Sequence, residues 1–248
     1  MRKNKKHGVY ILPNLLTTLS LFAGFYGIIE VISGHPEKTI IAILIAAFID
    51  GLDGCMARLT KTVTVFGAEY DSLSDLVVFG LAPAILILTY TLKPLGRLGF
   101  LAAFLYVACG ALRLARFNTQ LKKVSLNYFV GLPIPAAAIS IVLTISICKQ
   151  WQFSTNITQF LILGFTYLLS FLMVSNIRYY SFKDLQWVKH RPFQNLVLFV
   201  LLMVVIMAHP FLMLWSFSIV YLVSGPISLF FHRRTETQAK LKSNRIQD

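Results

Sequence analysis

The sequence predicts an all-α polytopic membrane protein of about eight transmembrane helices, with both termini in the cytoplasm. Of the 248 residues, 56% are hydrophobic, and the mean hydropathy is +0.70. A soluble domain rarely exceeds half apolar residues. The apolar residues also come in long blocks, as a membrane requires. The net charge of +13 is typical of basic cytoplasmic loops rather than of a nucleic-acid-binding surface, because the basic residues lie between apolar blocks.

A helix needs about 20 apolar residues to cross the hydrocarbon core of a membrane. Eight blocks meet or approach this length, at residues 14–33, 39–59, 67–91, 97–117, 133–150, 155–176, 193–208 and 210–231. The last two are separated by His209 and Pro210, and a proline suits a tight turn between helices. We therefore predict one membrane domain over residues 1–231 and a polar cytoplasmic tail over residues 232–248.

The basic residues predict the orientation of these spans. With the N-terminus inside, 19 of the 23 Lys and Arg residues fall on the inner side and 4 on the outer side. Cytoplasmic loops of membrane proteins carry such an excess. The pattern thus favours a multi-pass protein of the cell (inner) membrane.

Four aspartates lie inside the second and third predicted spans: Asp50, Asp53, Asp71 and Asp75. An unpaired charge at the centre of a span costs about 2.5–3.5 kcal/mol on insertion scales, so four would cost on the order of 10 kcal/mol. Ion pairing with Lys or Arg is one explanation, but Arg58 is the only basic side chain nearby on these two helices. The four carboxylates therefore need another counter-charge.

The spacing of the aspartates indicates what that counter-charge is. Asp50 and Asp53 are three residues apart and Asp71 and Asp75 four apart, so each pair shares one helix face. The short link makes the two helices antiparallel neighbours, and Asp50 and Asp75 both lie roughly 15 Å from it. Converging carboxylate oxygens suit Mg²⁺ or Mn²⁺, and two such ions would neutralise all four charges. We expect a site for two divalent metal ions.

The residues around the aspartates resemble a known family. The pattern reads Asp50-Gly51-x-Asp53-Gly54-x-x-Ala57-Arg58, then eight residues, Gly67, three residues, Asp71, three residues and Asp75. Every fixed position of the CDP-alcohol phosphotransferase signature is present at the right spacing. Residues 13–17 resemble the N-terminal segment of that family. Residues 113–118, 131–135 and 174–183 resemble its phosphatidylserine synthase branch.

The resemblance implies an activity and a role for each motif residue. CDP-diacylglycerol and L-serine would be the substrates, and the protein would be a homodimer. The distribution of basic residues places the active site on the cytoplasmic side. Asp50, Asp53 and Asp71 would bind the first metal ion, and Asp50, Asp71 and Asp75 the second, with Asp75 also accepting the proton of the attacking hydroxyl. The residues expected to contact CDP-diacylglycerol are Asn14, Thr17, Gly54, Ala57, Arg58 and Thr64.

The acceptor alcohol is predicted from fewer residues. Arg113 and Arg116 share a face at the inner end of the fourth span, with Asn118 close behind. A carboxylate matches the planar fork of an arginine, so we expect one of the two to bind the carboxylate of serine. Snorkelling of both side chains to the interface is the alternative.

Other functions remain open from the sequence. Glycerol 3-phosphate or an inositol phosphate would require a cluster of cations, and choline an aromatic cage. From a different class, a divalent-cation transporter also places aspartates inside the membrane. A transporter, however, gains nothing from Gly54, Ala57 and Arg58 at fixed offsets.

Overall fold

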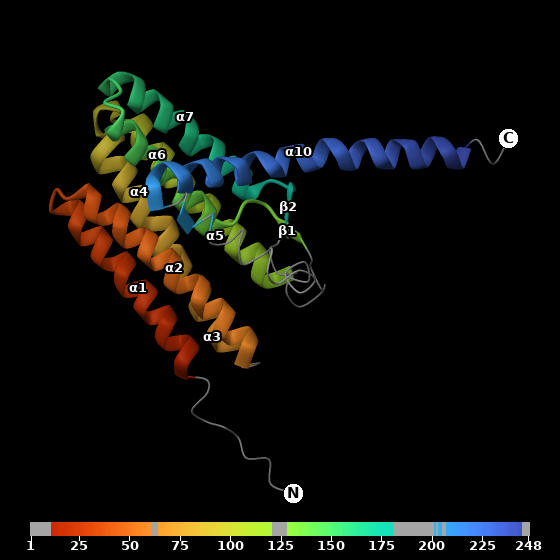
Figure 1. Ribbon diagram of the computed structural model, residues 1–248, viewed down its shortest axis with the longest axis horizontal. Coiled ribbons are helices and arrows are strands. Elements are labelled where there is room, and N and C mark those ends of the chain that lie inside the picture. Colours follow the sequence, from red (N-terminus) through yellow and green to blue (C-terminus); the bar gives the residue numbers. More distant parts are fainter. Residues whose placement is uncertain are drawn as a thin grey trace, which may run out of the picture.

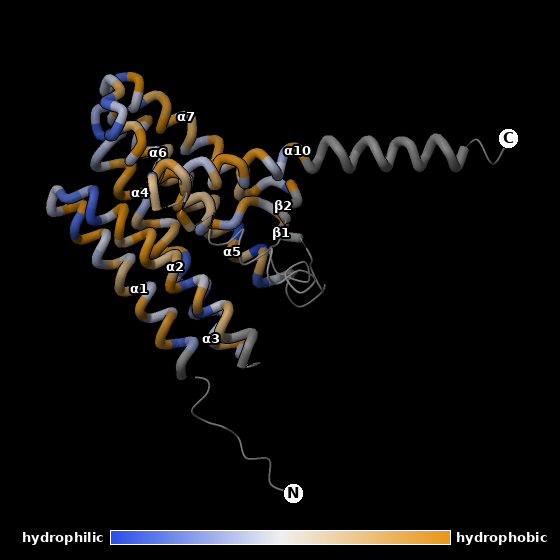
Figure 2. Tube along the Cα trace, viewed as in Figure 1, coloured by the Kyte–Doolittle hydropathy of each residue, from blue (hydrophilic) through white to orange (hydrophobic). Residues whose placement is uncertain are grey.

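The computed structural model describes residues 11–60, 64–120, 128–180, 201, 203–204 and 207–244. Within these residues it confirms a helical, polytopic membrane protein, since six helices are long and apolar enough to cross a membrane and Ile134–Gln150 is a shorter apolar helix. Hydrophobic residues cover most of these helices, while polar residues gather at the turn between the first two (Figure 2). The predicted span at 193–208 lies largely outside the described residues.

Seven of the α-helices contain most of the described residues, and their order can be followed by colour in Figure 1. Their bounds are α1 Ile11–Ile32, α2 Pro36–Thr60, α3 Val65–Asp75, α5 Arg97–Gln120, α6 Ile134–Gln150, α7 Thr155–Val174 and α10 Pro210–Asn244. Most of these agree with the predicted spans to within a few residues. The exceptions are α3, which covers only the first part of the predicted span 67–91, and α10, which continues to Asn244. The predicted polar tail therefore begins inside a helix and not at the end of one.

The helices α1 and α2 form an antiparallel hairpin. Its turn contains Gly34, whose φ of +88° is favourable only for glycine. Thr39 donates a hydrogen bond to the Gly27 carbonyl (2.8 Å), and Ser20 donates one to the Ala46 carbonyl (3.1 Å). These bonds satisfy hydroxyls inside the bundle, where water is absent.

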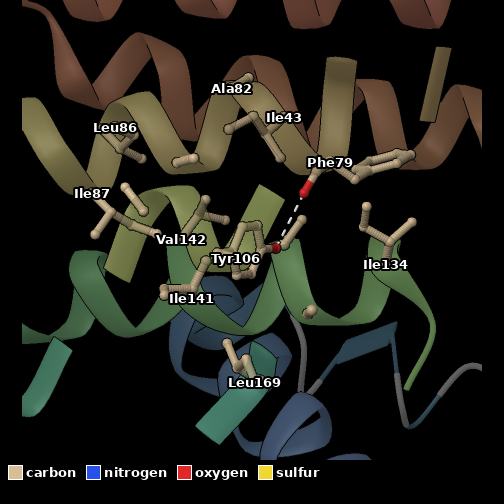
Figure 3. Close-up of a cluster of buried hydrophobic side chains, with 14 of the residues drawn as sticks. Ile43, Phe79, Ala82, Leu86, Ile87, Tyr106, Ile134, Ile141, Val142 and Leu169 are labelled. Atoms are coloured by element: carbon tan, nitrogen blue, oxygen red, sulfur yellow. Dashed lines mark hydrogen bonds between the residues drawn. The ribbon is translucent and has the colours of Figure 1, made fainter. Parts of the chain in front are cut away.

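The third span is irregular, which the sequence did not predict. After α3 the chain forms a π-helix, η1 (Leu76–Leu81), then the short helix α4 (Ala82–Leu86), a second π-helix, η2 (Ile87–Leu92), and a 3₁₀ turn, η3 (Lys93–Leu95). Pro83 has no N–H, so the α-helical hydrogen-bond partner of the Phe79 carbonyl is missing. Tyr106 of α5 replaces it, and donates its hydroxyl to that carbonyl at 3.1 Å (Figure 3).

The hydrophobic core surrounds this irregular span. Phe79, Leu86 and Ile87 are fully buried against Tyr106 of α5 and Ile141 of α6, as Figure 3 shows. Large apolar side chains on the outer faces of α1, α2, α5 and α7 are exposed instead, as a lipid-facing surface requires. The third span is therefore the centre of the bundle.

Two three-residue strands accompany the helices and were not predicted. β1 (Tyr128–Val130) pairs antiparallel with β2 (Arg178–Tyr180), and Phe129 lies opposite Tyr179. Gly131 follows β1 with φ +81°, and a Cβ on it would lie 2.3 Å from the Met173 carbonyl oxygen. A glycine is thus required where the chain passes the end of α7.

Candidate active site

Three carboxylates meet between α2 and α3. Asp50 of α2 and Asp71 and Asp75 of α3 each place a carboxylate oxygen within 4.8 Å of the other two. All three side chains are half-buried. Among the residues whose side chains the structure describes, the acidic partners in ion pairs are Glu30 and Glu37, at the opposite end of α1 and α2. The structure thus confirms the predicted convergence for these three aspartates.

Thr64 is the N-cap of α3 and so determines where the helix that carries Asp71 and Asp75 begins. Thr64 is extended, and its hydroxyl accepts a hydrogen bond from the Gly67 N–H at 3.0 Å. A Cβ on Gly67 would lie 3.0 Å from that hydroxyl and 3.3 Å from the Asn14 Oδ1 atom. The motif glycine therefore allows α1 and α3 to approach closely. The structure gives Thr64 a capping bond, and its contact with a nucleotide stays a prediction.

Asp53 is buried and lies beside the three carboxylates rather than among them. Its carboxylate accepts a short hydrogen bond from the Thr17 hydroxyl of α1. It is still close enough to Asp71 for the two charges to interact. Ser74 of α3 donates to the Thr17 carbonyl at 3.4 Å, so Thr17 joins all three helices. This contact, through which Thr17 can orient Asp53, was not predicted from the sequence.

The remaining motif residues of α2 follow the aspartates toward the end of the helix. Gly54 is exposed, and a Cβ on it would meet no atom within 4 Å. The helix therefore leaves open space at Gly54, and its contact with a nucleotide stays a prediction. The side chains of Ala57 and Arg58 lie outside the described part of the chain.

The structure separates the three residues predicted to bind the acceptor. Arg113 is 7% exposed and close enough to Asp75 for their charges to interact. Arg116 instead donates to the carbonyl of Val174, the last residue of α7, at 3.4 Å and to Oδ1 of Asn176, just after that helix, at 2.7 Å. Asn118 joins α5 to α3, since it donates to Glu69 at 3.1 Å and accepts from Ser72 at 3.2 Å.

The three converging carboxylates fit a divalent cation. A Mg²⁺ ion binds oxygen at about 2.0–2.1 Å, so two of its ligands lie at most about 4.2 Å apart. The observed separation needs only small side-chain movements to reach this value. Three half-buried anions at this distance repel one another strongly when no cation lies between them. Hard oxygen donors also match Mg²⁺ and Mn²⁺ better than softer metals.

Together, these features define a helical membrane protein with a carboxylate cluster inside its bundle that fits a divalent cation. The comparison with known families is more specific. The model of the CDP-alcohol phosphatidyltransferase family matches residues 10–173, and the chain belongs to this family. Its members are metal-dependent transferases. The interpretation as a cation transporter is therefore not supported.

Individual relatives carry more specific names. The chain is 39% identical over 226 residues to the CDP-diacylglycerol–serine O-phosphatidyltransferase of Helicobacter pylori strain J99, a match that covers 90% of this chain and 92% of the relative. A Bacillus subtilis protein of the same name is 35% identical over 69% of this chain and 91% of its own length. An archaetidylserine synthase of Methanothermobacter thermautotrophicus is 38% identical over 72% of this chain and 74% of its own length.

Proposed function

We propose that this protein transfers the phosphatidyl group of CDP-diacylglycerol to the hydroxyl of L-serine, giving phosphatidylserine and CMP. The observation that carries the proposal is the placement of Arg113, a buried cation, beside Asp75 of the carboxylate site. A transferase site for a plain alcohol has no need of this cation, whereas an amino acid brings a carboxylate to pair with it. The names of the relatives support the same acceptor.

The reaction is a direct displacement at phosphorus. The serine oxygen forms a bond to the phosphorus that carries diacylglycerol, and the bond from that phosphorus to the CMP oxygen breaks. Asp75 accepts the proton of the serine hydroxyl, because a hydroxyl with an unperturbed, very high pKa needs a base within hydrogen-bond reach. A single displacement inverts the configuration at phosphorus, so retention would contradict the mechanism.

The cation site consists of the four motif aspartates. Asp50, Asp53 and Asp71 hold the first divalent ion, and Asp50, Asp71 and Asp75 the second, with Mg²⁺ or Mn²⁺ as the metal. Bound cations supply neutralisation of the pyrophosphate charge and of the departing CMP. Thr17 keeps Asp53 turned toward the site through its hydrogen bond.

The substrates lie on two sides of this site. CDP-diacylglycerol lies along α2, where Gly54 and Ala57 leave room for cytidine and Arg58 pairs with phosphate oxygens; Asn14, Thr17 and Thr64 line the same end. Serine lies toward α5, with its carboxylate on Arg113. Arg116 and Asn118 act through their bonds to Asn176 and Glu69, which fix the end of α5.

The arrangement in the membrane follows from the charge distribution. We propose eight spans, both termini in the cytoplasm, and an active site that opens to the cytoplasmic side of the inner membrane, where serine is available. The family resemblance adds a homodimer as the assembly. Reporter tags at both ends should be accessible only from inside the cell, which tests the topology. Cross-linking of the purified protein should give a dimer, which tests the assembly.

The labelled-acceptor experiment tests the reaction. Purified protein in detergent receives CDP-diacylglycerol, Mg²⁺ and one radiolabelled alcohol at a time: serine, glycerol 3-phosphate, inositol phosphate or choline. We expect label from serine alone to enter lipid, with one CMP released per lipid formed. Asp75→Asn abolishes the transfer, and the matched control Glu37→Gln, at the opposite end of the bundle, retains it. Incorporation of a different alcohol would contradict the proposed acceptor.

A further inference from the structure

The surroundings of Arg113 indicate that it binds a ligand, because the described residues do not satisfy all of its hydrogen-bond donors. The side chain is more than nine-tenths buried, and its Nε atom has no hydrogen-bond partner among the described residues. Its guanidinium lies 5.8 Å from the centre of the Phe117 ring, which screens one face. Two other groups interact with its charge: Asp75 and the phenol of Tyr221.

Tyr221 comes from a different part of the chain. It lies on α10, beyond the residues 10–173 that the family model matches. Trp215, nearly two turns earlier on α10, donates its indole N–H to the Thr144 hydroxyl of α6 at 3.0 Å. This bond fixes α10 against α6, so Tyr221 lies on a helix that is held against the bundle.

The ring of Tyr221 is held by Tyr179 of β2. The two ring centres are 5.5 Å apart and tilted by 40°, a geometry that aromatic pairs favour. Burial raises the pKa of Tyr179 to about 12, so its hydroxyl keeps its proton and donates to the Leu222 carbonyl at 3.5 Å. A Cβ on Gly225 would lie 2.3 Å from the Tyr179 ring, so only glycine allows α10 this close.

The arrangement has the chemistry of a carboxylate pocket. A carboxylate offers about four acceptor positions, of which a guanidinium fork uses two. The phenol of Tyr221 is close enough to interact with the same guanidinium, and its hydroxyl can supply a further neutral donor without adding charge. A buried N–H group without an acceptor, such as that at Nε of Arg113, is costly, and a carboxylate that binds there removes the cost.

We propose that Tyr221 is a specificity-determining residue of the acceptor site, which binds, together with Arg113, the carboxylate of a hydroxy-amino acid. This inference rests on the proposed function and extends it to α10. Tyr179 and Gly225 are positioning residues that hold the Tyr221 ring in place. Selection of an amino acid over other acceptor alcohols thus involves α10, which lies outside the matched family domain.

The test removes only the hydroxyl. Tyr221→Phe is compared with Tyr167→Phe, a half-buried tyrosine of α7 that is not among the groups interacting with Arg113. Because a hydrogen bond to a charged group contributes about 1.5–3 kcal/mol, we expect the KM for serine to rise roughly tenfold or more in Tyr221→Phe. The KM for CDP-diacylglycerol and kcat at saturating serine stay at the wild-type values.

A second acceptor separates binding from structure. L-Serinamide keeps the hydroxyl and the ammonium of serine but carries a neutral amide instead of the carboxylate. The preference of the wild type for serine over serinamide should fall in Tyr221→Phe and stay unchanged in Tyr167→Phe. A Tyr221→Phe protein with the wild-type preference, or with equal losses for both substrates, overturns the inference. Failure of the wild type to use serine at all would instead refute the proposed function.

Discussion

The hydrogen bond between Tyr106 and the Phe79 carbonyl gives a direct test of how the third span is stabilised. Both residues are fully buried, and the α-helical donor for this carbonyl is absent because residue 83 is proline. The change Tyr106→Phe keeps the ring and removes the hydroxyl. The carbonyl then lies in the apolar centre of the bundle without this donor, where no water replaces it.

The expected loss follows from the cost of such a group. A buried acceptor left unsatisfied costs about 1–3 kcal/mol. For a chain of this size, each kcal/mol corresponds to about 2–4 °C in Tm, so we expect Tyr106→Phe to lower the Tm in detergent by roughly 2–10 °C. Tyr90→Phe, at a tyrosine that is 44% exposed, should leave the Tm unchanged. Both are measured by circular dichroism during heating at one scan rate.

A second background tests the physical reason. Pro83→Ala restores an N–H four residues after Phe79, where a helical donor belongs. Tyr106→Phe should then lower the Tm by clearly less in the Pro83→Ala protein than in the wild type, because the carbonyl has an alternative donor. Equal losses in the two backgrounds, or no loss in the wild type, would refute the reasoning. Activity measured well below the Tm should persist, since Tyr106 belongs to the hydrophobic core and is not one of the site residues.

Three further results test the site itself. Gly54→Leu fills the open space on α2 and should raise the KM for CDP-diacylglycerol at least several-fold at unchanged Tm. Gly164→Leu is the control, since a Cβ at Gly164 also meets no atom within 4 Å, and it should leave this KM unchanged. Equal KM values in the two variants would contradict a nucleotide site at Gly54. Thr17→Val removes the hydrogen bond that orients Asp53 and should increase severalfold the Mg²⁺ concentration needed for half-maximal activity, an effect that titration of the metal detects. Chelation of metal ions with EDTA should abolish activity, and added Mg²⁺ or Mn²⁺ should restore it. Mg²⁺ should also raise the Tm of the wild type but not that of Asp50→Asn, because binding stabilises only a protein that has the site.

The sequence was informative wherever a physical cost had to be offset locally. Charges inside apolar spans are expensive, so Asp50, Asp71 and Asp75 stood out, and helical spacing alone brought them to one side of a hairpin. The structure places their oxygens within 4.8 Å of one another. The bond from Thr17 to Asp53 was not predicted, because it joins residues 36 positions apart and depends on how α1 packs.

Features that depend on long-range packing were missed for the same reason. Nothing local distinguishes Arg113 from Arg116, since both are basic residues at the end of one span. The structure separates them through groups far along the chain, Asn176 for Arg116 and Tyr221 for Arg113. The strand pairing of β1 with β2 is also non-local, and three-residue strands produce no periodic pattern in the sequence.

The charges of the proposed complex indicate why the acceptor is a zwitterion. Two divalent ions balance the four motif aspartates. The pyrophosphate diester of the CDP-lipid carries two negative charges, which Arg58 and the ammonium group of the amino acid balance. Arg113 then remains, and the carboxylate of the amino acid neutralises it. Glycerol 3-phosphate would leave the half-buried site with excess negative charge and choline with excess positive charge, and either excess is costly at low dielectric. An acceptor with one ammonium and one carboxylate leaves no excess charge in the site. The need of Arg113 for a negative partner therefore explains the choice of acceptor as directly as the aspartates explain the metal.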